Sequence, residues 1–246
     1  GGYHDAGDFD RRPMHTIIPI HFLNYYEIMK EKFYDGQYNI PDKFDKSYNT
    51  LGSGNGIPDF LDEALWGVLL YEYLQQDDGS VMSGTEANAH PGYGSDSASK
   101  DKMIYGTWAP TGHVCASATG MFAHSSRLLK KYDSIKAAEL LKRAEKGWEF
   151  LNSGSINIEG LESQLLYSSL ELYLATATGN NEEDKNNKYH KKFLEYLDFL
   201  FNKNPGWPQQ FKPGYLAVGW DNKQGILSPY FMGYLITDKY TDYTWK

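Results

Sequence analysis

Long hydrophobic runs are missing from this sequence: nowhere do about 18 apolar residues follow one another, the length that a helix needs to cross a bilayer. No basic-then-apolar leader opens the chain either, so we expect neither a membrane span nor a signal peptide within these 246 residues. Cysteine is nearly absent. Because Cys115 stands alone, an internal disulfide and a metal site built from several cysteines are both excluded.

Clusters of basic residues are missing as well. The 24 Lys and Arg residues are scattered and the net charge is −8, which argues against a nucleic acid partner. No repeat of fixed period is present, so the usual solenoid families are not supported. Aromatic residues, in contrast, are abundant: they make up 15% of the chain, including 20 Tyr and 6 Trp. Their rings can pack in a core or stack on the apolar faces of sugars.

The apolar spacing is helical rather than alternating. In residues 59–76 apolar side chains recur at three- and four-residue steps, as a single buried stripe requires. Similar patterns predict helices at residues 12–31, 111–131, 134–152, 160–178, 189–202 and 228–237. No two-residue alternation competes with them, so the predicted class is all-α, in one domain over residues 1–246.

The connections between these helices differ in length. A short link near residues 131–134 and long Gly-, Ser-, Asn- and Pro-rich segments at 36–57, 77–107 and 204–224 favour stacked helical hairpins with elaborated loops. Loops longer than about 15 residues usually carry function. The polar run at 180–188 is predicted to be a solvated loop.

Two carboxylates near the start of the chain are candidates for chemistry. Asp5 and Asp8 lie three residues apart with Ala6 and Gly7 between them, so on a turn both can point into one small volume. Hydrolysis of a glycosidic bond with inversion needs a carboxylate base and a carboxylic acid. The spacing alone equally fits an Asp-Gly turn with helix-capping aspartates, so it does not decide the function.

Further segments in fixed order strengthen the functional interpretation. The stretch NGIPDFLDE at residues 55–63 follows GGYHDAGDFDRR at 1–12, and WDNKQG at 220–225 comes later. Together these segments resemble glycoside hydrolase family 9, in which a DAGD segment, an NGxPDxLDE helix start and a WDxK segment recur in this order. The segment YGTWAPTGHVCASA at 105–118 is also similar, and the resemblance covers essentially the whole chain.

The resemblance implies an (α/α)6 barrel, incomplete in this chain, and secreted hydrolysis of β-1,4-linked glucans with inversion. By the same resemblance Asp8 is the general base and Asp5 helps to hold the nucleophilic water. The family's general acid is a Glu near the C-terminus of the catalytic domain, and no equivalent segment follows Trp220 here. We therefore expect that this chain lacks the last part of the domain and is nearly inactive alone. Glu63 is interpreted as a charge at the start of its helix, and neither it nor Glu86 is assigned as the acid.

Aromatic and imidazole side chains are the candidate substrate contacts. Trp108, Trp207 and Trp220 lie in or beside long loops, where they would either stack on sugar rings or pack half-buried. His4 and His90 would either bond sugar hydroxyls or serve a structural role. The partner is then a β-glucan polysaccharide or oligosaccharide, and accessory carbohydrate-binding modules could accompany this domain in the parent protein.

Calcium is the one cofactor that the resemblance raises. Relatives often bind it through an Asp-Glu pair, but the aligned positions here hold Ser163 and Gln164, so we expect no cofactor and consider calcium doubtful. Two alternatives to an endoglucanase remain open. One is an exo-acting glucosaminidase or a mixed-linkage glucanase on the same fold, and the other is a non-catalytic carbohydrate-binding fragment.

Overall fold

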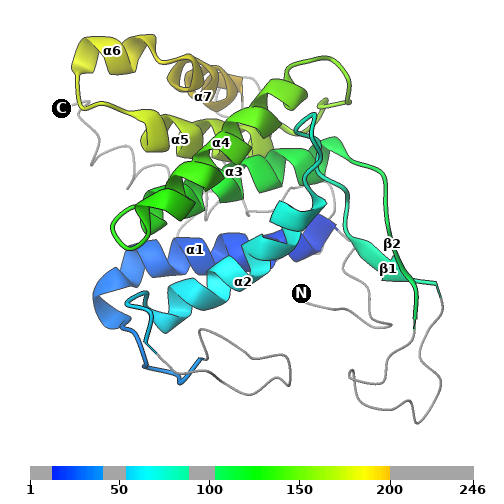
Figure 1. The fold of residues 1–246 in the computed structure, drawn as a ribbon. Helices are drawn as coiled ribbons and strands as arrows, with labels where there is room; N and C mark the ends of the chain where they lie inside the picture. The colour runs from blue at the N-terminus through cyan, green and yellow to red at the C-terminus, as the bar shows by residue number, and fades with distance from the viewer. Residues whose placement is uncertain (1–12, 41–53, 89–102, 200–246) are drawn as a thin grey trace, which may run out of the picture.

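The computed structural model describes residues 13–40, 54–88 and 103–199 (Figure 1). Two short strands in these ranges, β1 (Thr85–Ala87) and β2 (Tyr105–Thr107), form an antiparallel ribbon. None of the described helices is long and apolar enough to cross a membrane. The helical elements are η1 (Pro13–Thr16), α1 (Ile17–Met29), η2 (Lys30–Lys32), α2 (Asp59–Leu74), α3 (Gly112–Leu129), α4 (Ser134–Leu151), α5 (Glu162–Thr176), α6 (Asn181–Asn186) and α7 (Lys188–Asp198).

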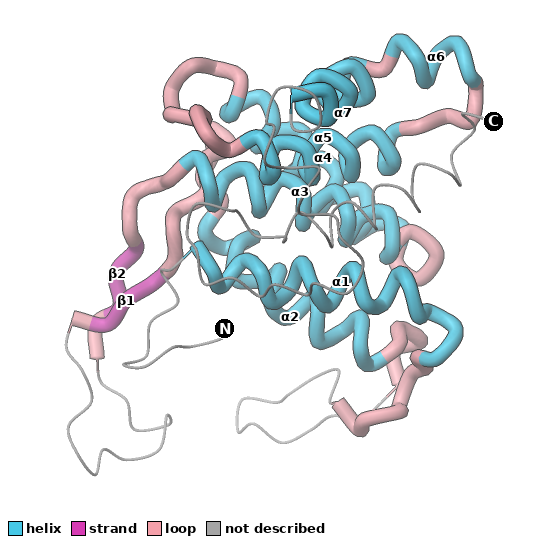
Figure 2. The backbone as a smooth tube through the Cα atoms, turned by 180° about the vertical axis from the view of Figure 1, so that it is seen from behind, coloured by secondary structure: helices cyan, strands magenta, loops and turns pink. Residues whose placement is uncertain are grey.

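The long helices pack in successive pairs. α1 lies along α2, α3 along α4 and α5 along α7, and α3 also packs against α5 (Figures 1 and 2). Paired helices of this kind are the unit that an (α/α)6 barrel repeats. The all-α prediction is therefore confirmed, and the predicted hairpins are present with the short link falling between α3 and α4.

The core centres on α3, which buries fifteen of its 18 residues. Neighbouring helices approach α3 from several sides, so its side chains must be small where they pack closely. Gly120 shows this directly: a Cβ built there would lie 2.3 Å from the Tyr167 ring of α5. The partner helix α4 buries only six of its 18 residues, spaced at three and four, so it covers α3 with one face and presents the other to solvent.

The predicted helix boundaries hold to within a few residues. Capping hydrogen bonds and backbone conformation explain where α4 and α5 begin. α4 begins at Ser134 as predicted because the Asp133 carboxylate caps it, accepting the N–H groups of Ile135 and Lys136 at 3.1 and 2.9 Å. The helix predicted from residue 160 begins instead at Glu162, since Gly160 has a left-handed φ of +75°.

Two sequence predictions are wrong. The run at 180–188 contains the short helix α6, because the Asn180 side chain caps it and the Asp184 carboxylate folds back onto the N–H groups of Thr178 and Gly179. The segment at 77–107 contains the β1–β2 ribbon, whose three-residue strands are too short to produce a recognisable alternation. The helix predicted at 228–237 lies outside the described residues.

Candidate functional site

The start of α2 carries the second sequence motif, and its first carboxylate is structural. Asp59 is 1% exposed and accepts the backbone N–H groups of Gly36 and Tyr38, each at 2.6 Å. Burial opposes ionisation of Asp59, but these hydrogen bonds and a longer one from Ile40 hold its pKa below the usual value. Asp59, in the first turn of α2, thus fastens residues 36–40 to the helix.

The residues before this helix form a second set of contacts around a glycine. Gly56 has φ of +83°, a conformation that favours glycine, and its N–H donates to the Asp35 carboxylate at 2.7 Å. The Asn55 side chain accepts the N–H of Ile57 at 2.6 Å and donates to the Asp62 carboxylate at 3.3 Å. The motif therefore fixes residues 55–57 against the first turn of α2 and against Asp35.

Of the predicted site residues, the structure describes Trp108. The predicted catalytic pair, Asp5 and Asp8, lies outside the described residues, although it precedes η1 and α1 directly in the sequence. The other predicted substrate contacts that lie outside the described ranges are His4, His90, Trp207 and Trp220.

Trp108 lies at the root of the β1–β2 ribbon with its ring partly open to solvent. Trp108 is 47% exposed, and its indole N–H donates to the Glu86 carboxylate at 2.8 Å. An exposed fraction of about one half is compatible with both sequence-based alternatives, so sugar stacking by Trp108 stays a prediction. Glu86 is thereby placed beside an aromatic ring, a position that sequence reasoning did not anticipate.

The ribbon is anchored on the first turn of α3. The Ser83 hydroxyl donates to the Thr111 hydroxyl at 3.0 Å, and Thr111 caps α3. The backbone N–H of Val81 donates to the sulfur of Cys115 at 3.3 Å, and burial raises the pKa of this thiol to about 11. Cys115 is thus a packing residue in the apolar core, and the core helix holds the ribbon in place.

The positions aligned with the family's calcium ligands lie in the first turn of α5. Gln164 is buried, and its side-chain oxygen accepts no hydrogen bond within the part of the chain that the structure describes. Ser163 beside it is half-buried. Two neutral oxygens in place of two carboxylates supply no negative charge, which weakens any calcium site at these positions.

A buried charged cluster joins the three core helices, and sequence reasoning missed it. Arg127 of α3 contacts Glu27 of α1 at 2.5 Å and Glu171 of α5 at 2.9 Å. His124 lies one turn earlier on α3, with Nε2 2.9 Å from the Glu27 carboxylate and Nδ1 3.1 Å from the Tyr167 hydroxyl. The available signal was a set of charged side chains on otherwise apolar helix faces.

The cluster has the composition of a metal site but the contacts of an ion-pair network. One ligand atom from each of Glu27, His124 and Glu171 can be chosen so that all lie within 4.8 Å of one another. The Arg127 guanidinium already bonds both carboxylates, and these charges raise its pKa despite the burial that opposes it. Arg127 supplies the cation, so the cluster is best interpreted as structural.

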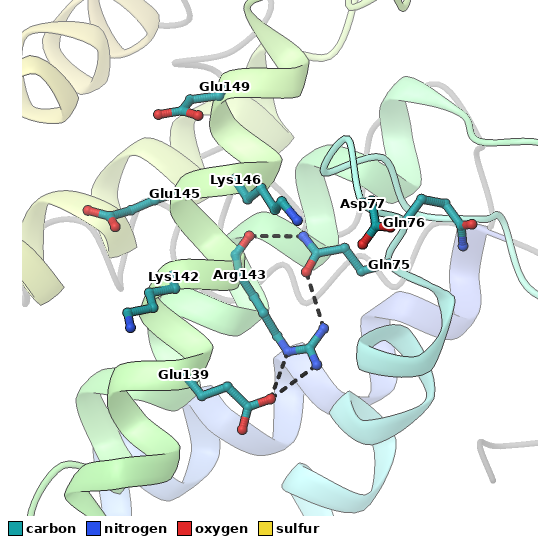
Figure 3. A pocket seen from close by; sticks show the side chains of 9 residues that line it. All are labelled: Gln75, Gln76, Asp77, Glu139, Lys142, Arg143, Glu145, Lys146 and Glu149. Atoms are coloured by element: carbon teal, nitrogen blue, oxygen red, sulfur yellow. Dashed lines mark hydrogen bonds and ion pairs between the residues drawn. The ribbon is translucent and has the colours of Figure 1, made fainter.

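A shallow pocket of about 560 Å³ lies between the end of α2 and the solvent face of α4 (Figure 3). Its nine lining residues include no aromatic ring, and several pair with one another: Arg143 bonds Glu139 at 3.1 Å, and the Gln75 side chain donates to the Arg143 carbonyl at 2.9 Å. This charged groove does not have the character of a sugar subsite.

The paired helices place the described residues in the class of all-α folds built from helical hairpins. The chain belongs to glycosyl hydrolase family 9, whose family model matches residues 1–243. The resemblance inferred from the sequence motifs is thereby confirmed.

Curated relatives and solved structures agree with this membership. The chain is 26% identical to Endoglucanase D of Acetivibrio thermocellus over 161 residues, covering 64% of this chain and 24% of that protein. It is 26% identical to a cellulose 1,4-beta-cellobiosidase of the same organism over 260 residues, covering 92% of this chain and 27% of that protein. The chain therefore spans about a quarter of the length of these relatives.

Solved structures show the same fold at low identity. A metagenome-derived family 9 endoglucanase superimposes with a TM-score of 0.65 at 24% identity, covering 96% of this chain and 39% of that one. A family 9 protein of Bacteroides ovatus gives a TM-score of 0.58 at 18% identity, covering 79% and 37%. The helical pairs of this chain thus match part of a larger family 9 fold.

The charged cluster generates a prediction about stability. Replacing Arg127 by Met removes the cation that compensates Glu171, which is fully buried, so we expect a loss of about 3–5 kcal/mol in the free energy of unfolding. Urea unfolding followed by circular dichroism measures this loss. Lys185→Ala, which breaks the exposed pair with Glu182, is the control and should cost less than about 1 kcal/mol. Equal effects of the two substitutions would contradict the structural role of Arg127.

Proposed function

We propose that this chain is part of the catalytic domain of an inverting endo-acting β-1,4-glucanase, with residues 1–246 forming one incomplete domain. The observation that carries the proposal is the family match over residues 1–243, which includes the Asp5-Ala6-Gly7-Asp8 motif. The endoglucanase among the curated relatives supports a β-glucan substrate. No nucleic acid or membrane partner is proposed, and the parent protein is proposed to be secreted.

In the proposed mechanism Asp8 is the general base. Its carboxylate takes a proton from a water molecule, which then attacks the anomeric carbon from the face opposite the leaving group, while Asp5 orients that water through a second hydrogen bond. A protonated Glu donates its proton to the departing glycosidic oxygen. The family's acid-bearing segment has no counterpart in this chain, so we place that Glu elsewhere in the full-length protein.

The substrate contacts are proposed from the aromatic and imidazole side chains. Trp108, Trp207 and Trp220 would stack on sugar rings, and His4 and His90 would bond hydroxyl groups. The exposed ring of Trp108 supports the first of these assignments. Exo-action is the second candidate, because a cellobiosidase aligns with 92% of this chain. A rapid fall in the viscosity of a soluble cellulose derivative relative to the release of reducing sugar would favour endo-action.

The assignment of Asp8 predicts a specific kinetic loss. In the full-length protein Asp8→Asn should lower kcat by about 10²–10⁴-fold with little change in substrate binding, because the amide keeps the shape of the side chain but cannot accept a proton. Hydrolysis of a soluble β-glucan measures this loss. Asp62→Asn, at the start of α2, is the matched control and should retain activity. An Asp8→Asn variant with wild-type kcat would rule out this assignment.

Inversion predicts the configuration of the first product. Because a water molecule must fit between sugar and base, the Asp8 carboxylate and the acid should be roughly 6.5–9.5 Å apart, and cleavage of a β-glucan should release the α-anomer first. Proton NMR in the first minutes of the reaction distinguishes the two anomers before mutarotation mixes them. An initial excess of the β-anomer would show that the enzyme is retaining.

We also propose that the domain uses no cofactor and that calcium does not stabilise it at Ser163 and Gln164. A ligand present at 100 times its Kd stabilises a protein by about 2.7 kcal/mol. Since two neutral oxygens bind calcium weakly, the melting temperature should be the same with millimolar calcium as with a chelator. The double variant Ser163→Asp, Gln164→Glu restores two carboxylates and should respond to calcium. A calcium-dependent rise in the wild-type protein would refute the proposal.

A further inference from the structure

α2 exposes aromatic side chains where a helix usually exposes charged ones. Trp66 is 47% exposed and Tyr73 is 78% exposed, and every other residue of α2 is buried or half-buried. On the solvent face of α4, in contrast, the exposed residues beyond the first turn are mainly charged, as at Glu139, Lys142 and Lys146. An ordinary solvated helix face has the character of α4, so the exposed rings of α2 require a separate explanation.

The two rings lie on one line along the helix. Trp66 and Tyr73 are seven residues apart, which places them about 20° apart around the axis and about 10.5 Å apart along it. Leu69 lies between them on the same face and is half-buried. Within the part of the chain that the structure describes, neither ring makes a hydrogen bond or stacks on another aromatic ring. Trp66, Leu69 and Tyr73 thus form a narrow apolar surface, the α2 strip.

The shape of the α2 strip fits a single extended polymer chain better than a protein. A stable protein interface buries about 800 Å² on each partner, whereas the α2 strip is one side chain wide and is flanked by buried positions of the same helix. Aromatic rings stack on the apolar faces of sugars, and the Tyr73 hydroxyl can bond a sugar hydroxyl. Successive sugars of a β-1,4-glucan are turned over, so like faces recur at the cellobiose repeat. The spacing of the two rings is comparable to that repeat.

From these observations we propose that the α2 strip is a binding site for one chain of a β-1,4-glucan. Trp66 and Tyr73 stack on two sugars of the chain that are separated by a third. The proposal rests on the β-glucan substrate proposed above and adds a polymer-binding surface on α2. Because both rings must be engaged at once for full affinity, binding should strengthen with the length of the oligosaccharide until it spans both rings.

The test measures the affinity of the full-length protein for hydroxyethyl cellulose by native electrophoresis in gels that contain this polymer. Trp66→Ala and Tyr73→Ala should each weaken binding about three- to tenfold, the effect expected for the loss of one aromatic stacking contact. Trp66→Phe and Tyr73→Phe keep a ring and should bind nearly as well as the wild-type protein. Ile135→Ala, which removes an 84% exposed apolar side chain from α4, is the matched control and should change nothing.

A second measurement uses the wild-type protein and does not depend on the folding of a variant. The full-length protein is labelled with 5-fluorotryptophan, and the ¹⁹F resonance that is missing from Trp66→Phe is assigned to Trp66. This resonance should shift when cellohexaose is added, and cellobiose at the same concentration should shift it less because it cannot span both rings. A Trp66 resonance that does not respond to cellohexaose would overturn the proposal.

The outcomes separate this site from the proposed function. If hydroxyethyl cellulose does not retard the wild-type protein, the β-glucan substrate fails and the α2 strip fails with it. If it retards the wild-type protein and both Ala variants equally, the protein binds β-glucan but not through the α2 strip. Unchanged binding with a lower melting temperature in Trp66→Ala would mean that another part of the full-length protein covers the strip. A loss in Ile135→Ala equal to that in Trp66→Ala would show unspecific adsorption, and either result would refute the inference.

Discussion

The need to neutralise a buried carboxylate constrains the core of this structure. Glu171 is fully buried on α5, and an ionised carboxylate there requires a cation within hydrogen-bonding distance. Arg127 of α3 supplies it and reaches Glu27 of α1 with the same planar guanidinium. Three helices from different pairs therefore meet at one side chain, and the position of each relative to the others is limited by that contact.

α3 is also closely packed between its neighbours α4 and α5. Because α3 is surrounded, its surface is built from small residues where neighbours approach, as at Gly120 against the Tyr167 ring. On the other side, a Cβ at Gly147 of α4 would lie 2.4 Å from the Thr119 hydroxyl. Larger side chains at Gly120 and Gly147 would push the helices apart. The packing of the helix pairs therefore depends on these two glycines.

The first turn of α3 holds the part of the ribbon that carries Trp108, the described candidate for substrate binding. Thr111 begins α3 and contacts Ser83, which in turn bonds the backbone of Trp108 at the root of the ribbon. A ring that is held in one orientation before a ligand arrives binds it more tightly, since ordering the ring during binding costs free energy. The membership in family 9 gives this surface its proposed ligand, and the motif that contains Asp5 and Asp8 precedes the first core helix directly.

The sequence by itself determined the helical class, the approximate helix boundaries and the family. Periodic apolar spacing reports which face of a helix is buried, and a motif such as residues 55–63 is contiguous in the sequence, so both can be recognised without the tertiary structure. Only the tertiary structure decided which charged residues meet. Glu27 and Arg127 are 100 positions apart, and Glu86 and Trp108 are 22 apart, so no local pattern records either contact. These pairs form because the packing of helices and the register of a ribbon bring distant residues together.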